Sequence, residues 1–282
     1  LDHGLRLVDF NRCGVPLVEM VTEPDLRSGE EAAQYLIQLR QLLRWIGVSE
    51  ADMERGHLRC DANVSIRERG SQVLNTKTEI KNVNSIDAVR QAIIEESKRQ
   101  IELVESGGKV VSYTLDWDAD TGKLSMMRSK ETEADYRYFR EPDLLPVVLT
   151  EEEIARIKAE LPELPPERKA RFEMEYGLSA YDAEILTADR GLSDYFETAV
   201  ASFGGEAKIV SNWMMNDLSR LMNDLGKSAS ELALTPAFLA QIIRMVEDGK
   251  ITAATGKSLL RKVEESRREP AQIVEAEGLA VI

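Results

Sequence analysis

The sequence predicts an α+β domain over residues 1–149 and an all-α domain over residues 150–282. The first part mixes strand-like and helix-like segments, whereas from about Thr150 onward the apolar residues recur at helical spacing almost throughout. A proline cluster, LPELPP at residues 161–166, marks the change and is the expected linker. Both parts are long enough to bury a core of their own.

The first elements of the chain are predicted to be a strand and a helix. GVPLVEMVTEPD, at residues 14–25, is a short apolar run that stops at a Glu-Pro-Asp turn. Ser28 and Glu31 then match the S-x-x-E capping box at the start of a helix, and Gly47 stands where a C-terminal glycine belongs. The apolar stripe of this helix is expected at Leu36, Leu39, Leu43 and Ile46.

Strict alternation of apolar and polar residues marks LRCDANVSIR, residues 58–67, as a half-buried strand. An antiparallel partner is expected around residues 76–81. A second helix should start near Ser85 and stop at Gly107-Gly108, with Val89, Ile93 and Ile101 on its apolar side. Residues 110–131 then predict a hairpin whose loop contains Asp120-Thr121-Gly122.

The second half contains a well-marked helix after Thr235, an N-cap residue followed by Pro236. ATGKS, at residues 254–258, looks like part of a phosphate-binding P-loop. We reject that interpretation because the required earlier glycine is Ile251 and no strand precedes it. NWMMNDL, around Trp213, is expected to be helix core with methionine filling gaps.

The paired strands predict a polar face that suits phosphoryl transfer. If they pair, six polar side chains share one side of the sheet. Carboxylates are the ligands that Mg²⁺ prefers, while Arg and Lys hold phosphate oxygens and offset transition-state charge. The alternative is a solvated face with ordinary cross-strand salt bridges. The six residues are Arg59, Asp61, Asn63, Lys77, Glu79 and Lys81.

Glu19 is a further candidate because it lies inside the apolar run PLVEMV. A carboxylate in such a run is costly to leave buried and unpaired, so a ligand role is one interpretation. The other is an edge-strand residue whose carboxylate stays in water.

The composition restricts the function. The net charge is −14, and neither half is basic, so a protein that coats nucleic acid by bulk electrostatics is excluded. No apolar stretch approaches the ~20 residues of a membrane helix. Two cysteines, Cys13 and Cys60, suit a reducing, cytoplasmic compartment. The chain opens at Leu1 without an initiator methionine or a signal peptide, which suggests a fragment with sequence missing upstream.

Four long motifs, in order, resemble the signature segments of the GatB family, the B subunits of the aspartyl/glutamyl-tRNA amidotransferase. They are DFNRCGVPLVEMVTEPDLRS, LRCDANVSIR, TEIKNVNS and DYRYFREPDL. The likeness continues through LPELPPERKARF, AYDAEIL and SNWMMNDL, so it covers nearly the whole chain.

The resemblance implies an activity. The B subunit uses ATP and Mg²⁺ to phosphorylate the side-chain carboxylate of the amino acid on Glu-tRNA(Gln) or Asp-tRNA(Asn). Ammonia, released from glutamine by the A subunit, then displaces the phosphate, and a small C subunit wraps the other two. The family's metal acids carry over by motif to Glu19, Asp61 and Glu79. Asp61, Glu79 and Arg59 are the catalytic candidates. Arg59 is our candidate for phosphate or substrate contact, and Lys77, Lys81 and Asn63 are our candidates for the cofactor.

The implied fold is a cradle domain of the glutamine synthetase/guanido kinase type, an antiparallel sheet with helices on one face. Residues 1–149 would be its C-terminal part, without the earlier strand of Glu and His ligands. The YqeY-like tail domain that grips tRNA should begin about where this chain stops, so the isolated chain is expected to be inactive. A basic island at residues 250–268 either touches tRNA phosphates or is a solvated helix face.

Two other functions stay open at this point. One is a non-catalytic module that docks the partner A and C subunits or tRNA. The other is the related archaeal E subunit, which acts on Glu-tRNA(Gln) alone and carries an inserted domain after the cradle. Here EPDLLPVVLTEEEIARIK passes directly into the helical part, which favours the B subunit.

Overall fold

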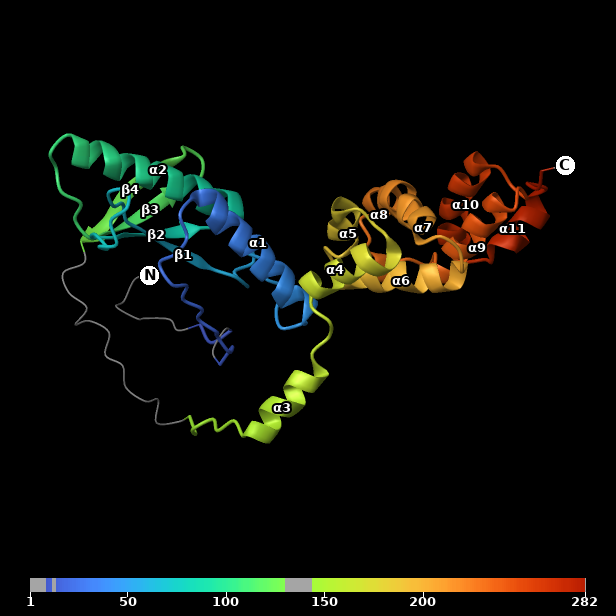
Figure 1. Cartoon of the computed structure of the whole chain (residues 1–282), viewed down its shortest axis with the longest axis horizontal. Helices are drawn as coiled ribbons and strands as arrows, with labels where there is room; N and C mark the ends of the chain where they lie inside the picture. Colours follow the sequence, from blue (N-terminus) through green and yellow to red (C-terminus); the bar gives the residue numbers. More distant parts are fainter. Residues whose placement is uncertain (1–8, 12–13, 130–143, 282) are drawn as a thin grey trace, which may run out of the picture.

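The computed structural model describes residues 9–11, 14–129 and 144–281 (Figure 1). It is a mixed α/β protein with one sheet in its first half and helices in its second. The motif DYRYFREPDL lies almost wholly outside the described residues, as does Cys13.

The sheet has four strands in the order β1-β2-β3-β4. Strands β1 and β2 pair antiparallel, as predicted, and so do β3 and β4 around the expected hairpin loop. Strands β2 and β3, however, are parallel, which corrects the expectation of an antiparallel sheet. A parallel pair needs a crossover, and helix α2 carries the chain back to provide it. The bounds are β1 Cys60–Val64, β2 Thr78–Val83, β3 Tyr113–Asp118, β4 Lys123–Ser129 and α2 Ile86–Glu105.

Helix α2 packs on one face of the sheet, and α1, Gly29–Trp45, packs on α2 (Figure 1). Ser28 caps α1, as predicted, and Ser85 caps α2, which begins where the sequence places it. The helices cross closely at Gly29, where a Cβ atom would lie 2.6 Å from the carbonyl oxygen of Arg90. A small core fills the space between these layers. It contains Leu36, Ala62, Val64, Ile80, Val83, Ala88, Val89, Ala92 and Trp117.

One strand prediction was wrong, and a second was wrong in extent. Residues 15–22 form no strand, because the run pairs with no neighbour among the described residues, and a strand needs one for its backbone groups. Its side chains are exposed, with Leu17 at 89%. Strand β1 stops at Val64 because its partner β2 begins at Thr78, directly opposite.

The second half is helical over its described residues, which agrees with the periodicity of the sequence. Helix α3 begins at the Thr150 capping box but buries no side chain, so the helical core starts at Pro165. The elements are α3 Glu151–Glu160, α4 Pro165–Tyr176, α5 Ala180–Leu186, α6 Arg190–Phe203, α7 Ala207–Trp213, a π-helix Met214–Leu218, α8 Ser219–Leu225, a 3₁₀ turn Ala229–Glu231, α9 Pro236–Glu247, α10 Ala253–Ser266 and α11 Pro270–Glu277.

The helical core is larger than that of the sheet region and holds Phe172, Phe196 and Met214. Gly256 lies inside it. A Cβ there would be 2.9 Å from the Trp213 ring, so glycine lets α10 approach α7. ATGKS is therefore part of helix α10, as expected, and its glycine serves packing.

The two halves touch through the C-terminal end of α1. The indole N–H of Trp45, which is almost fully buried, donates to the carbonyl oxygen of Glu163 at 2.9 Å. The guanidinium of Arg168, on α4, lies 5.6 Å from the centre of the Trp45 ring. Gln41 adds a hydrogen bond of 2.8 Å to the carbonyl oxygen of Thr187. Side-chain contacts from α1 therefore join the two halves in addition to the linker.

Candidate functional site

The predicted polar face exists, and its centre is a cluster of Asp61, Lys81 and Glu79 on the side of the sheet away from α2. The ammonium Nζ of Lys81 lies 3.0 Å from Asp61 Oδ2 and 3.7 Å from Glu79 Oε1. The side chains are exposed by 47% at Asp61, 32% at Lys81 and 16% at Glu79. The cluster is open to solvent on the aspartate side and sheltered on the glutamate side.

Local pairing of β1 and β2 creates this cluster. Asn63 lies opposite Glu79, but the register shifts between Cys60 and Ala62, which is a β-bulge. Asn82, the residue after Lys81, has φ +61°, a left-handed conformation that asparagine tolerates better than most residues. Bulges of this kind re-aim side chains and are frequent beside active sites.

The third strand holds the cluster from its other side. Thr114, in β3, is in register with Glu79 and donates from Oγ1 to Glu79 Oε2 at 3.3 Å. Asp116, in register with Lys81, accepts from Asn82 Nδ2 at 2.6 Å. Sequence reasoning missed both contacts because they depend on the parallel pairing of β2 with β3.

The donor atoms suit a hard divalent cation, because two carboxylates supply oxygen ligands close together. Yet no three His, Cys, Asp or Glu side chains gather into a metal-holding group anywhere in the described part of the chain. Glu19 lies in the exposed segment 15–22 and is not part of such a group with Asp61 and Glu79. The three-acid metal site stays a prediction.

The other predicted residues lie nearby without a defined role. Arg59 and Lys77 directly precede β1 and β2 and are exposed, and Asn63 is exposed on β1. Cys60, next to Asp61, is not a nucleophile at neutral pH, because burial and then the Asp61 charge raise the pKa of its thiol to about 11.

A cavity of about 620 Å³ lies at the end of the sheet, next to the cluster. It shares Asn82 and Asp116 with the contacts described above. The rest of its lining is mostly polar. Asn84 lies between β2 and α2, and the β3–β4 hairpin supplies Trp117, Asp118, Ala119, Asp120, Thr121, Lys123, Leu124 and Ser125. Asp61, Glu79 and Lys81 do not line this hollow themselves, but Asn82 and Asp116 do, so it offers a polar ligand space near the cluster.

On the covered face, sequence reasoning missed a second polar group. Glu96 and Gln100 of α2 and Thr78 of β2 are fully buried and hydrogen-bonded to one another. A signal was present: Glu96 and Gln100 fall on the same helix side as Val89 and Ile93, where apolar residues are expected. These residues fasten α2 to the sheet.

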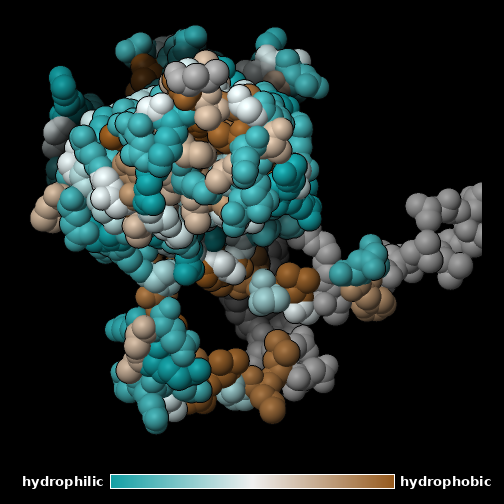
Figure 2. Space-filling view, turned by 90° about the vertical axis from the view of Figure 1, so that its right-hand side faces the viewer, coloured by the Kyte–Doolittle hydropathy of each residue, from teal (hydrophilic) through white to brown (hydrophobic). Residues whose placement is uncertain are grey.

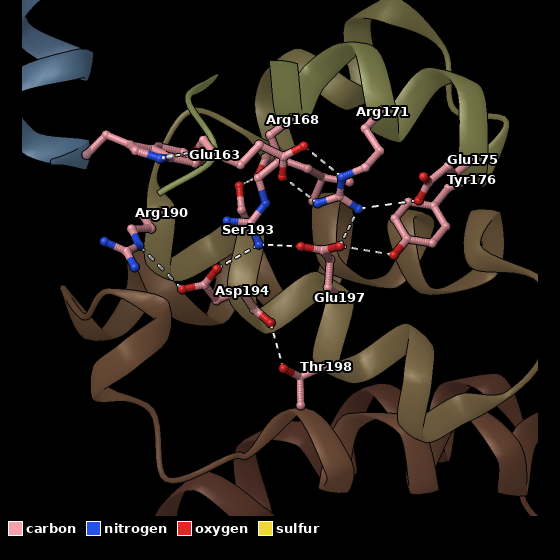
Figure 3. A network of polar contacts seen from close by, with 12 residues as sticks. Glu163, Arg168, Arg171, Glu175, Tyr176, Arg190, Ser193, Asp194, Glu197 and Thr198 are labelled. Atoms are coloured by element: carbon pink, nitrogen blue, oxygen red, sulfur yellow. Dashed lines mark hydrogen bonds and ion pairs between the residues drawn. The ribbon is translucent and has the colours of Figure 1, made fainter. Parts of the chain in front are cut away.

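The densest polar network lies in the helical half, far along the chain from the cluster (Figure 3). Arg168 and Arg171 of α4 bind Glu197 of α6, and Arg171 also binds Glu163 at 2.6 Å. Burial alone would raise the pKa of Glu197, but the bonds from the two arginines lower it. Every charge in this network faces an opposite charge, which indicates a structural role.

The basic island at residues 250–268 is largely neutralised. Four of its cations each face a carboxylate, which favours the solvated helix face over phosphate binding. The pairs are Lys250–Asp248, Lys257–Asp217, Arg261–Asp224 and Lys262–Glu277.

Exposed apolar side chains gather in two extended segments, residues 15–21 and 144–149. Val147, at 88%, is nearly as exposed as Leu17. Figure 2 shows brown, apolar surface below the compact part of the molecule. Among the helices that the structure describes, none has the length and apolar character required to cross a bilayer.

Two family models match the chain. The model described as the GatB/GatE catalytic domain matches residues 2–155, which include the cluster, and the model described as the GatB domain matches residues 194–282. The second match covers most of the helical core, from α6 onward.

Curated relatives match nearly the whole chain. A protein from Thermodesulfovibrio yellowstonii is 48% identical over 279 residues, which is 99% of this chain and 58% of the relative. One from Crocosphaera subtropica is 46% identical over 276 residues (98% and 56%), and one from Methylobacillus flagellatus is 44% identical over 272 residues (96% and 57%). All three are named as the B subunit of an aspartyl/glutamyl-tRNA(Asn/Gln) amidotransferase. The chain thus spans less than three fifths of the length of these relatives.

Proposed function

This chain belongs to the GatB/GatE family, and we propose that its sheet region is part of a site that activates the side-chain carboxylate of a misacylated tRNA. The substrates are Glu-tRNA(Gln), Asp-tRNA(Asn) or both. The names of the relatives support a tRNA-dependent amidotransferase role in protein biosynthesis. We propose the B subunit over the E subunit because the described chain runs from residue 144 directly into α3, without an inserted domain.

The chemistry has two steps. The carboxylate oxygen attacks the γ-phosphorus of ATP, ADP leaves, and an acyl phosphate forms. Ammonia then attacks the carbonyl carbon, inorganic phosphate leaves with the bonding electron pair, and the surplus proton passes to solvent or a base. The phosphate is needed because a carboxylate has no good leaving group of its own.

The observation that carries this proposal is the Asp61–Lys81–Glu79 cluster on an open sheet face, inside the family-matched residues. Asp61 and Glu79, with Glu19, would hold Mg²⁺, which when bound offsets charge on the transferring phosphoryl group. Arg59, Lys77 and Lys81 would contact phosphate oxygens, and Asn63 would contact the nucleotide. The adjoining cavity gives a polar ligand room beside the cluster.

The partners follow from the reaction. The A subunit would supply ammonia from glutamine, the C subunit would hold the assembly together, and the complex would work in the cytoplasm.

Asp61→Asn tests this function in the longer protein, assembled with the A and C subunits. The change keeps the volume of the side chain but removes the negative charge that favours a divalent cation. We expect phosphorylation and amidation of Glu-tRNA(Gln) to fall by about 100-fold or more. Glutamine hydrolysis should persist at least in part, because that chemistry lies on another chain. The measurement is amidated tRNA and glutamate release in the same preparation, and normal amidation by the variant would refute the proposal.

A second candidate function, docking without catalysis, is favoured by the exposed apolar segments 15–21 and 144–149. Contiguous exposed apolar surface often marks a protein interface. A docking module has no need of Asp61, so the same assay decides between the two: docking alone predicts unchanged amidation by Asp61→Asn.

A further inference from the structure

Lys81 is placed unusually for a phosphate-binding lysine, because its ammonium group already lies between two carboxylates. Nζ is 3.0 Å from Asp61 Oδ2 and 3.7 Å from Glu79 Oε1. A cation that bound both carboxylates would have to lie in the same region, since Mg²⁺ sits about 2.0–2.1 Å from each ligand oxygen. The ammonium and a metal ion therefore compete for one position.

The local charges favour an exchange. Asp61 and Glu79 carry two negative charges and Lys81 carries one positive charge, so the cluster keeps one net negative charge. A divalent cation in place of the ammonium would neutralise both carboxylates. Without any cation, two carboxylates this close would repel each other and move apart.

The ammonium group of Lys81 can also move out. About a third of the side chain is exposed, and the lysine stem is long and flexible. An ion pair with this much exposure is weak, so a divalent ion can displace it at small cost. Glu79, by contrast, is sheltered and held by Thr114. Glu79 therefore stays in place when the ammonium leaves, and the incoming ion replaces Lys81 as the partner of Asp61.

We propose that Lys81 is a resident counter-cation of this site, which holds Asp61 and Glu79 together until a divalent cation takes its place. The released ammonium group then becomes available to a phosphate oxygen of the nucleotide. This inference rests on the proposed function, because it concerns the same metal position. It predicts that Lys81 weakens metal binding.

The test uses the 282-residue chain and Mn²⁺ as the probe, with unbound Mn²⁺ followed by electron paramagnetic resonance. Lys81→Met should bind Mn²⁺ about tenfold more tightly than the original chain, because a competing charge next to both ligands is gone. Lys81→Arg keeps the charge and should stay within about twofold of the original. Asp61→Asn added to Lys81→Met should abolish the gain.

Lys98→Met is the matched control. Lys98 is an exposed lysine on α2, beyond the opposite face of the sheet, so the net charge changes equally at a distance from the cluster. It should change Mn²⁺ affinity by less than about twofold, because exposed charges are screened over about 10 Å. Lys81→Gln serves as a second variant if circular dichroism shows that Lys81→Met is unfolded.

Equal or weaker Mn²⁺ binding by the folded Lys81 variant overturns the inference, and so does the absence of millimolar binding in both chains. The result is independent of catalysis. If Asp61→Asn abolishes amidation while Lys81→Met leaves Mn²⁺ affinity unchanged, the function stands and the exchange is refuted. If Lys81→Met binds Mn²⁺ more tightly while Asp61→Asn leaves amidation normal, the exchange stands and the proposed function is refuted.

Discussion

The two faces of the sheet carry similar polar groups in opposite environments. On the covered face, Glu96 accepts from Thr78 Oγ1, Arg99 Nε and Gln100 Nε2, each at 2.7 Å, and its side chain is fully buried. On the open face, Asp61 and Glu79 flank Lys81 within reach of water. The fold supplies the partners of the Glu96 carboxylate, whereas Asp61 and Glu79 can exchange Lys81 for a ligand.

The two faces differ in what their polar residues contribute: those on the covered face contribute to stability, and those on the open face are available for binding. A buried carboxylate costs free energy unless it is fully bonded, so removing it or a partner is expensive. An exposed ion pair contributes little to stability. Its residues can therefore serve ligand binding without being needed for folding. We therefore expect changes on the covered face to unfold the sheet and changes on the open face to affect binding alone.

Glu96→Ala should have the largest effect on stability. It removes the carboxylate that accepts from Thr78, Arg99 and Gln100, and leaves the buried Thr78 and Gln100 with the carbonyl oxygen of Val64 as their remaining backbone acceptor. We expect a loss of about 3 kcal/mol in the free energy of unfolding. Urea denaturation followed by tryptophan fluorescence measures it. Glu95→Ala, an exposed neighbour on the same helix, is the control and should stay within about 0.5 kcal/mol. If Glu95→Ala and Glu96→Ala lowered the free energy of unfolding equally, the buried carboxylate of Glu96 would have no special role in stability.

Acid should weaken the covered face in a way that depends on Glu96. Burial alone would raise the pKa of Glu96, but hydrogen bonds from Arg99, Gln100 and Thr78 lower it below its ordinary 4.5. Because the folded pKa is depressed, the contribution to stability is complete above about pH 4.5 and is lost as the pH falls through the folded pKa.

Glu96→Gln checks this dependence, because glutamine cannot titrate. The variant should be less stable at pH 7, and its urea midpoint should change less than that of the original chain between pH 5 and pH 3. If the urea midpoints of the two chains fell by the same amount between pH 5 and pH 3, Glu96 would not be the cause of the loss of stability in acid.

Asp61→Asn should have the smallest effect on stability, within about 0.5 kcal/mol, because the side chain is half exposed. The same urea titration measures it. A loss as large as that of Glu96→Ala would place Asp61 among the residues that hold the sheet together and would remove the distinction between the faces.

Local signals predicted most of the elements. Ser28 and Thr235 each cap a helix as expected, a helix begins directly after Ser85 and another after Thr150, and the loop at residues 120–122 joins β3 to β4. These features depend on neighbours within a few residues. The parallel pairing of β2 with β3 does not, because it requires the whole of α2 as a crossover.

The same limit applies to the candidate site. Alternation along β1 and β2 was sufficient to place Asp61, Glu79 and Lys81 on one face, and the structure confirms that placement. The contact of Thr114 with Glu79 joins residues 35 positions apart and depends on pairing between strands that the periodicity does not reveal. The position of Glu19 depends on a strand partner that the described residues do not supply.

The hydrogen bond from Trp45 to Glu163 bears on the order of folding. It joins residues 118 positions apart, and the whole sheet lies within the loop that it closes. Loop closure over such a distance is slow, whereas the α1–α2 pair and the β3–β4 hairpin are local and form early. We therefore expect the indole to meet its partner only after both halves have taken shape, which would make the joint between them a late step of assembly.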